Sequence, residues 1–119
     1  MINFTSHMRI LVGITPIDMR KGIDGVALAC RKILQEDPMS GAIFIFTNRS
    51  RKMLRILSYD DQGFWLCTKR LSKGRFPYWP WVNGKSTMLL QAHEAHVLIR
   101  GGNPAELKTI EPWKKIVNF

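Results

Sequence analysis

The sequence predicts a single α+β domain, in which a central antiparallel β-meander packs against one main helix and a smaller helix follows toward the C-terminus. Two observations carry this prediction. Three β-rich segments follow one another across short polar turns, and one earlier segment has the periodicity of an amphipathic helix. The length of 119 residues fits one domain, and the 45% hydrophobic content excludes a disordered chain.

The N-terminal part is predicted to run from a strand into the main helix. Residues 9–14, RILVGI, are β-rich and bounded by polar residues, which is typical of a strand. Thr15 and Asp18 have the spacing of a helix start, and we expect a short turn over 16–21 before a helix over 22–35. An apolar stripe predicts the buried face of that helix, which consists of Val26, Ala29, Cys30, Ile33 and Leu34.

The meander is predicted from three consecutive apolar segments. The run at 42–47 is continuously apolar, as in a strand that is covered on both faces, and strands at 53–59 and 64–71 follow it. The linkers at 48–52 and 60–63 are short and polar, so neighbouring strands should be antiparallel. The first and third strands of the meander then point the same way.

The C-terminal part is predicted to add smaller elements. Residues 72–85 form a loop punctuated by glycine and proline, 86–90 a short strand, and 91–100 the smaller helix, which Gly101 and Gly102 stop. Asn103 and Pro104 suit the start of one more helical turn. We expect residues 1–119 to be one domain, with a tail from about 109 that either packs back or is mobile.

Composition limits the classes of partner and the compartment. Eighteen Lys and Arg against nine Asp and Glu give a net charge of +9, which favours a polyanionic partner such as DNA, RNA or an anionic membrane. No apolar run approaches the roughly 18 residues of a membrane span, and the N-terminus lacks the layout of a signal peptide. We therefore expect a cytoplasmic protein with no membrane partner. The two cysteines, Cys30 and Cys67, are expected to be free thiols.

Candidate catalytic and metal-binding groups are explained by structural roles. The HEAH motif at 93–96 spaces its histidines at i and i+3, whereas a zinc-binding helix needs i and i+4. The aspartates could in principle form a two-metal nuclease site, but their positions suit turns and a helix start; they are Asp18, Asp24, Asp60 and Asp61. We therefore predict a protein that is not an enzyme and has no catalytic residues, metal or cofactor. A nuclease is the weaker alternative.

The most informative stretch is a basic block that ends in aromatic residues. Between Arg49 and Arg75 the net charge is +6. The antiparallel meander should bring the 48–52 turn and the end of the 64–71 strand to the same end of the sheet, where arginine forks could hold phosphates. The candidate nucleic-acid-binding residues in this block are Arg49, Arg51, Lys52, Arg55, Lys69, Arg70, Lys73 and Arg75.

The aromatic residues near this block have two readings. They could stack on unpaired bases, or they could fill the core of the domain. We expect the core for most of them, because tryptophan is first of all a large apolar side chain. The residues in question are Trp65, Phe76, Trp79 and Trp81.

These residues resemble a known family. The motifs Leu54-Arg55-Ile56-Leu57, Gly63-Phe64-Trp65-Leu66, Lys69-Arg70-Leu71 and Gly74-Arg75-Phe76, with Phe46, Asn48, Arg49 and Asp60, are similar to the TnpB-type accessory protein of bacterial insertion sequences of type sixty-six. The segment from Asp18 to Gly25 resembles the N-terminal signature of the same family, and it adds Arg20 and Lys21 to the candidate DNA-binding residues. The resemblance covers about residues 4–81 and does not extend past about 85.

The resemblance implies a bacterial protein that assists the transposase of the same mobile element during DNA recombination, with no catalytic residues of its own. The sequence therefore predicts a non-catalytic accessory protein that binds DNA through a basic patch. The alternative is an adaptor that docks on the transposase without touching DNA, with the tryptophan-rich block as an interface. The oligomeric state and any preference for sequence or strand stay open.

Overall fold

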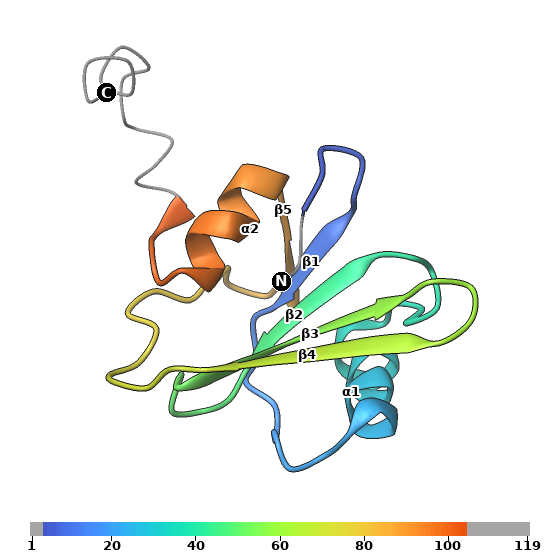
Figure 1. Ribbon diagram of the computed structural model, residues 1–119, viewed down its shortest axis with the longest axis horizontal. Coiled ribbons are helices and arrows are strands. Elements are labelled where there is room, and N and C mark those ends of the chain that lie inside the picture. The colour runs from blue at the N-terminus through green and yellow to red at the C-terminus, as the bar shows by residue number, and fades with distance from the viewer. Residues whose placement is uncertain (1–3, 105–119) are drawn as a thin grey trace.

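The computed structural model describes residues 4–104. Its centre is a five-stranded sheet in the order β4-β3-β2-β1-β5 (Figure 1). Strand β1 is parallel to β2, and all other neighbouring strands are antiparallel. The strands are β1 (Ile10–Gly13), β2 (Ile43–Thr47), β3 (Met53–Tyr59), β4 (Phe64–Arg70) and β5 (Thr87–Leu90). The predicted α+β class and the antiparallel meander, β2-β3-β4, are confirmed.

Helices cover both faces of the sheet. Helix α1 (Ile23–Ala29) continues directly into the π-helical turn η1 (Cys30–Leu34) and forms the crossover between the parallel strands β1 and β2 (Figure 1). Helix α2 (Ala92–Ile99) follows β5 and lies on the opposite face. Of the helical turn predicted at Asn103 and Pro104 the structure describes only these first residues, of which Pro104 is helical; the predicted tail from about 109 lies outside the described residues.

The alternation of side chains along each strand divides the core into two layers. Leu11, Phe44 and Leu57 pack on the α1 side, whereas Val12, Ile45 and Ile56 pack on the α2 side. Every residue of β2 is buried, because this central strand is covered on both faces. The residues of β4, at the edge of the sheet, are half-buried or exposed.

The buried face of the main helix differs from the predicted stripe. Val26, Cys30 and Leu34 are buried, but Ile33 is 38% exposed and Ala29 is only half-buried. In α1 the buried face is turned toward Ala27, which is buried although the predicted stripe lacks it. In η1 the hydrogen bonds of the π-helical turn span five residues instead of four. The wider turn keeps residues four apart on one face and carries residue i+3 away from it. The prediction that Ile33 is a core residue is therefore wrong.

The predicted role of Thr15 and Asp18 as a helix start is also wrong. The helix begins at Ile23 after Gly22, which makes no side-chain capping bond. The Asp18 carboxylate instead accepts a hydrogen bond from the backbone N–H of Arg20 at 2.9 Å. Aspartate closes such turns with its own side chain, and this local bond competes with helix formation.

The aromatic arm after β4 is divided between core and surface. Phe76 and Trp79 are buried, and the Trp79 indole N–H donates to the Gly13 carbonyl at 3.0 Å. Trp65 and Trp81, in contrast, are 63% and 71% exposed. The prediction that the aromatic residues fill the core is therefore confirmed for Phe76 and Trp79 and wrong for Trp65 and Trp81. Tyr78 is half-buried and packs against the α2-side core.

Gly13 has two roles at the end of β1. Its carbonyl accepts the Trp79 bond, and an added Cβ would lie 2.6 Å from the Phe46 ring. The backbone therefore approaches the core so closely that only glycine fits without displacing Phe46.

In the described part of the chain no helix is long and apolar enough to cross a membrane.

We predict that Leu34→Ala lowers the free energy of unfolding by about 2–5 kcal/mol, because it empties a packed site under η1. Ile33→Ala is the matched control, and we expect it to cost clearly less because Ile33 is partly exposed. Urea unfolding followed by circular dichroism measures both. Equal losses for the two variants would mean that η1 continues as a regular α-helix with Ile33 in the core.

We predict that Trp79→Ala costs about 3–5 kcal/mol of unfolding free energy, since it removes a buried ring and the bond to Gly13. Trp81→Ala should change stability by no more than about 0.5 kcal/mol, as expected of an exposed residue. Thermal unfolding of both variants under identical conditions compares them. A Trp79→Ala protein as stable as the wild type would contradict a core role for this residue.

Candidate nucleic-acid interface

The 48–52 turn and the chain after β4 meet at one end of the sheet. The strand register places Met53 opposite Arg70, at the start of β3 and the end of β4. Beyond this pair, the Leu71 N–H donates to the Lys52 carbonyl at 2.9 Å, and the Phe76 N–H donates to the Arg51 carbonyl at 2.7 Å. The predicted approach of the two basic clusters is thus confirmed, with backbone hydrogen bonds holding them together.

The turn itself is held in shape by short-range bonds. The Asn48 side-chain oxygen accepts from the N–H groups of Lys52 and Met53 at 3.1 and 3.3 Å. The Thr47 hydroxyl donates to the Met53 carbonyl at 2.8 Å. Arg51 has a φ of 59°, a left-handed conformation that a non-glycine residue rarely adopts. The turn therefore presents its cations on an ordered backbone.

The candidate cations of the turn and the arm differ in solvent exposure. Arg51 is half-buried, whereas the other candidate cations of the turn and the arm are exposed. Their side chains have no ion pair within residues 4–104. These exposed candidates are Arg49, Lys52, Arg70, Lys73 and Arg75.

Arg20 and Lys21 lie on the loop that precedes α1 and reach the same end of the sheet. The Ile17 N–H donates to the carbonyl of Thr47, the last residue of β2. Arg20 forms a forked ion pair with Asp18, with Nη2 to Oδ2 at 3.0 Å and Nε to Oδ1 at 3.1 Å. This hydrogen-bonded pair holds the pKa of Asp18 at about 2 and raises that of Arg20. The charge of Arg20 is therefore largely balanced.

Arg55, another candidate DNA-binding residue, has a structural role. It is half-buried on β3, and its guanidinium Nη1 donates to the Lys21 carbonyl. Its Nε is buried with no hydrogen-bond partner among the described residues. This side chain ties the loop before α1 to the sheet. The structure thus uses Arg55 to position Lys21.

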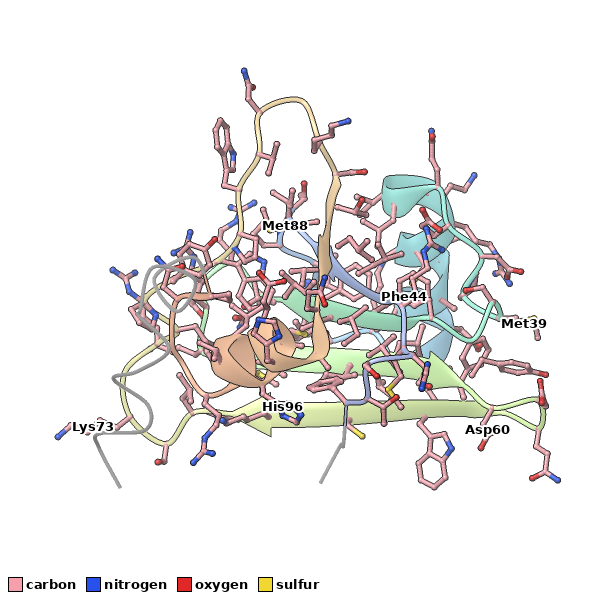
Figure 2. All side chains as sticks on the ribbon, turned by 90° about the horizontal axis from the view of Figure 1, so that it is seen from above. Met39, Phe44, Asp60, Lys73, Met88 and His96 are labelled. Atoms are coloured by element: carbon pink, nitrogen blue, oxygen red, sulfur yellow. The ribbon has the colours of Figure 1, made fainter. Side chains whose placement is uncertain are left out.

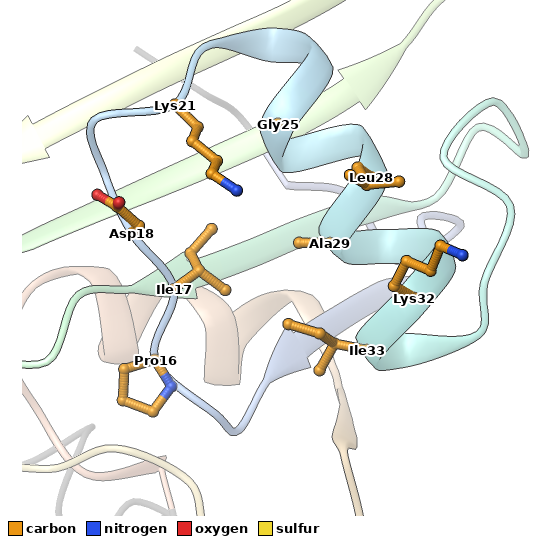
Figure 3. A pocket seen from close by; sticks show the side chains of 9 residues that line it. All are labelled: Pro16, Ile17, Asp18, Lys21, Gly25, Leu28, Ala29, Lys32 and Ile33. Carbon is orange, nitrogen blue, oxygen red and sulfur yellow. The ribbon is translucent and has the colours of Figure 1, made fainter.

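The same loop borders a cavity of about 310 Å³ along α1 (Figure 3). Lys21 lies beside Gly25, where an added Cβ would come within 2.3 Å of the Lys21 Cβ. Glycine at this position allows the close approach of loop and helix. The apolar side chains of Leu28 and Ile33, both partly exposed, lie on the helix at the border of this cavity.

Lys69 joins the basic end to helix α2. Its Nζ donates to the carbonyl of Ile99 at 2.6 Å, at the C-terminus of the helix, where a cation is favoured by the helix dipole. The next residue, Arg100, is exposed, and as the neighbour of Ile99 it lies at the same end of the molecule. Sequence reasoning missed Arg100, because the pattern that ends the helix at Gly101 does not show where the helix packs.

We call the cations gathered at this end of the sheet the basic surface. They come from the loop before α1, the 48–52 turn, the end of β4 with its following arm, and the end of α2. The basic surface comprises Arg20, Lys21, Arg49, Arg51, Lys52, Lys69, Arg70, Lys73, Arg75 and Arg100.

The acidic turn at Asp60 and Asp61 lies away from the basic surface, whereas Asp18 lies beside Arg20 and pairs with it. Figure 2 shows Lys73 and Asp60 at opposite ends of the β3–β4 pair. Asp60 accepts hydrogen bonds from the Trp65 indole N–H at 2.7 Å and from the N–H groups of Gln62 and Gly63 at 3.1 Å. These bonds, the Trp65 bond first, lower the pKa of Asp60. Its carboxylate is committed to the turn, as predicted from the sequence.

No group of three or more potential metal ligands occurs within residues 4–104. His93 is exposed, whereas His96 is half-buried and its ring meets Phe4 edge-on at a centroid distance of 4.8 Å. The two histidines of the HEAH motif thus differ in surroundings. Glu94, between them, closes a capping box with Gln91 at the start of α2.

Comparisons with known proteins identify the family of this chain. A family model described as IS66 Orf2-like protein matches residues 8–109. "Uncharacterized protein y4hO" of Sinorhizobium fredii is 34% identical over 92 residues, which cover 77% of this chain and 79% of that protein. "Uncharacterized protein y4jC" of the same organism is 32% identical over 101 residues, or 85% of each chain. No solved structure matches. The chain belongs to the IS66 Orf2-like family, and this membership implies an accessory role in the transposition of an insertion sequence.

Proposed function

We propose that the protein is a non-catalytic accessory factor of transposition that binds DNA through the basic surface. The observation that carries this proposal is the convergence of cations from separate segments of the chain on one end of the sheet. Backbone hydrogen bonds join the 48–52 turn to the arm after β4, so the cations of these two segments keep fixed positions relative to each other. Arginine and lysine in such a cluster can each contact a phosphate.

The charge distribution supports contact with a polyanion. The chain has a net charge of +9, and the acidic turn at Asp60 and Asp61 lies at the far end of β3 and β4. A duplex that lies on the basic surface would therefore meet cations without meeting these carboxylates. Such contacts to phosphates give affinity that depends on salt and little on sequence.

An adaptor function on the transposase is the second candidate, and a separate observation favours it. Leu28 and Ile33 are 45% and 38% exposed along the cavity beside α1 (Figure 3). Neighbouring exposed apolar side chains are suited to a protein interface. A Leu28→Ser, Ile33→Ser variant should lose co-purification with the transposase of the same element if this face is the docking site, and it should keep DNA binding.

We predict that affinity for duplex DNA falls several-hundred-fold between about 50 and 200 mM salt, as expected if four to six cations contact phosphates. The slope of log K against log salt should be roughly −4 to −5. Replacing Arg70 and Arg75 by alanine should flatten the slope by about one unit per lost contact. Fluorescence polarisation with a labelled duplex measures these slopes.

The matched control for this experiment removes two cations from the other end of the sheet. Arg9 lies at the start of β1, where it pairs with Glu36 at 3.3 Å, and Arg31 is exposed on η1. Arg9→Ala with Arg31→Ala lowers the net charge as much as the test variant does. An equal change of slope in both variants would mean that net charge alone, rather than the basic surface, drives binding.

We predict that purified protein does not nick DNA when Mg²⁺ or Mn²⁺ is added, because Asp18 and Asp60 are engaged in local hydrogen bonds. Incubation with supercoiled plasmid followed by gel electrophoresis tests this. Metal-stimulated nicking that Asp60→Ala or Asp61→Ala abolishes would establish a nuclease and overturn the accessory role proposed here.

A further inference from the structure

A groove of about 820 Å³ lies between helix α2 and the outer strands of the sheet. Its floor is apolar and consists of side chains from β2, β3 and β4, among them Ile43, Ile56 and Cys67. Ile99 and His96 of α2 line the opposite wall, and Figure 2 shows His96 on this helix, toward β4. The groove exists because α2 packs over the middle of the sheet and leaves the edge strand uncovered.

The two ends of the groove differ in chemistry. Trp65 lines it near the Asp60 turn, with 63% of its surface exposed and its indole N–H held by the Asp60 carboxylate. Lys69 and Arg100 line it at the other end. Trp65 and Lys69 share one face of β4 and lie about 13 Å apart along the strand, at about 3.3 Å per residue.

The groove is continuous with the basic surface, because Lys69 and Arg100 belong to both. A strand of nucleic acid whose phosphates contact the basic surface could therefore extend past Lys69 over the apolar floor. Asp60 at the far end would repel a phosphate there. These charges favour a ligand that enters from the basic end and offers apolar, planar groups toward Trp65.

We propose that this groove binds unpaired bases of single-stranded DNA, with Trp65 as the stacking surface. An exposed indole fixed by a hydrogen bond offers its ring face at little cost in conformational freedom, and stacking of bases on aromatic rings tolerates any sequence. A paired duplex keeps its bases inside the helix and cannot use the groove. The inference rests on the proposed DNA binding and adds to it a preference for unpaired strands.

The first test compares the affinities of Trp65 variants for an oligothymidine and for a duplex, by fluorescence polarisation at one salt concentration. Trp65→Ala should weaken binding of the single strand by about 5- to 100-fold, the range expected when one base loses its stacking partner. Duplex affinity should stay within about twofold. Trp65→Phe also loses the Asp60 bond but keeps a ring, so it should retain most single-strand affinity. Trp81→Ala, at an exposed tryptophan outside the groove, should behave as the wild type.

The second test uses Cys67, a free thiol that lines the groove. Oligothymidine should slow the alkylation of Cys67 by iodoacetamide, and an equal concentration of duplex should not. Cys30 is the internal control, because burial raises its pKa to about 12 and keeps it unreactive in both cases. Mass spectrometry of peptides follows the two thiols separately.

The outcomes separate this inference from the proposed function. If the protein binds both DNAs but Trp65→Ala weakens neither and Cys67 is unprotected, the groove inference is overturned and DNA binding by the basic surface stands. If no DNA is bound, both fail. Protection of Cys67 by the transposase and not by oligothymidine would make the groove a protein-binding site. That result overturns the inference.

Discussion

The arm after β4 depends on the burial of Phe76 and Trp79, and the basic surface depends on the arm. Trp79 reaches across to Gly13 at the end of β1, and Phe76 bonds through its backbone to Arg51. These contacts fold the chain back over the sheet directly after Arg75. The aromatic core thus holds the arm that carries Lys73 and Arg75 beside the 48–52 turn, and both cations are exposed.

This arrangement separates stability from recognition within one short segment. The buried aromatics contribute free energy of folding, while the neighbouring cations are left exposed to solvent and to a polyanion. Arg55 and Asp18 belong to the structural group in spite of their charge, since one ties the loop before α1 to the sheet and the other closes that loop. A charged residue in the basic block is therefore not by itself a contact to DNA.

The sequence was sufficient for the meander and for the meeting of its basic ends, because short linkers allow only antiparallel neighbours and β2 is apolar on both faces. The exposure of Ile33 could not be predicted from the sequence, because a π-helical turn leaves the apolar pattern of an α-helix unchanged. The split between Trp79 and Trp81 depends on which ring reaches Gly13. The place of Arg100 and the groove beside Trp65 depend on how α2 packs, which no local pattern encodes.

The proposed function requires that one end of the sheet contacts DNA. Amide chemical shifts of the labelled protein, followed during titration with a duplex, test it most directly because they report each segment at once. We expect progressive shifts at residues 48–52 and 69–76, with little change at the 60–63 turn and along η1. Shifts concentrated on α1 and the 60–63 turn, with the 48–52 turn unaffected, would contradict it.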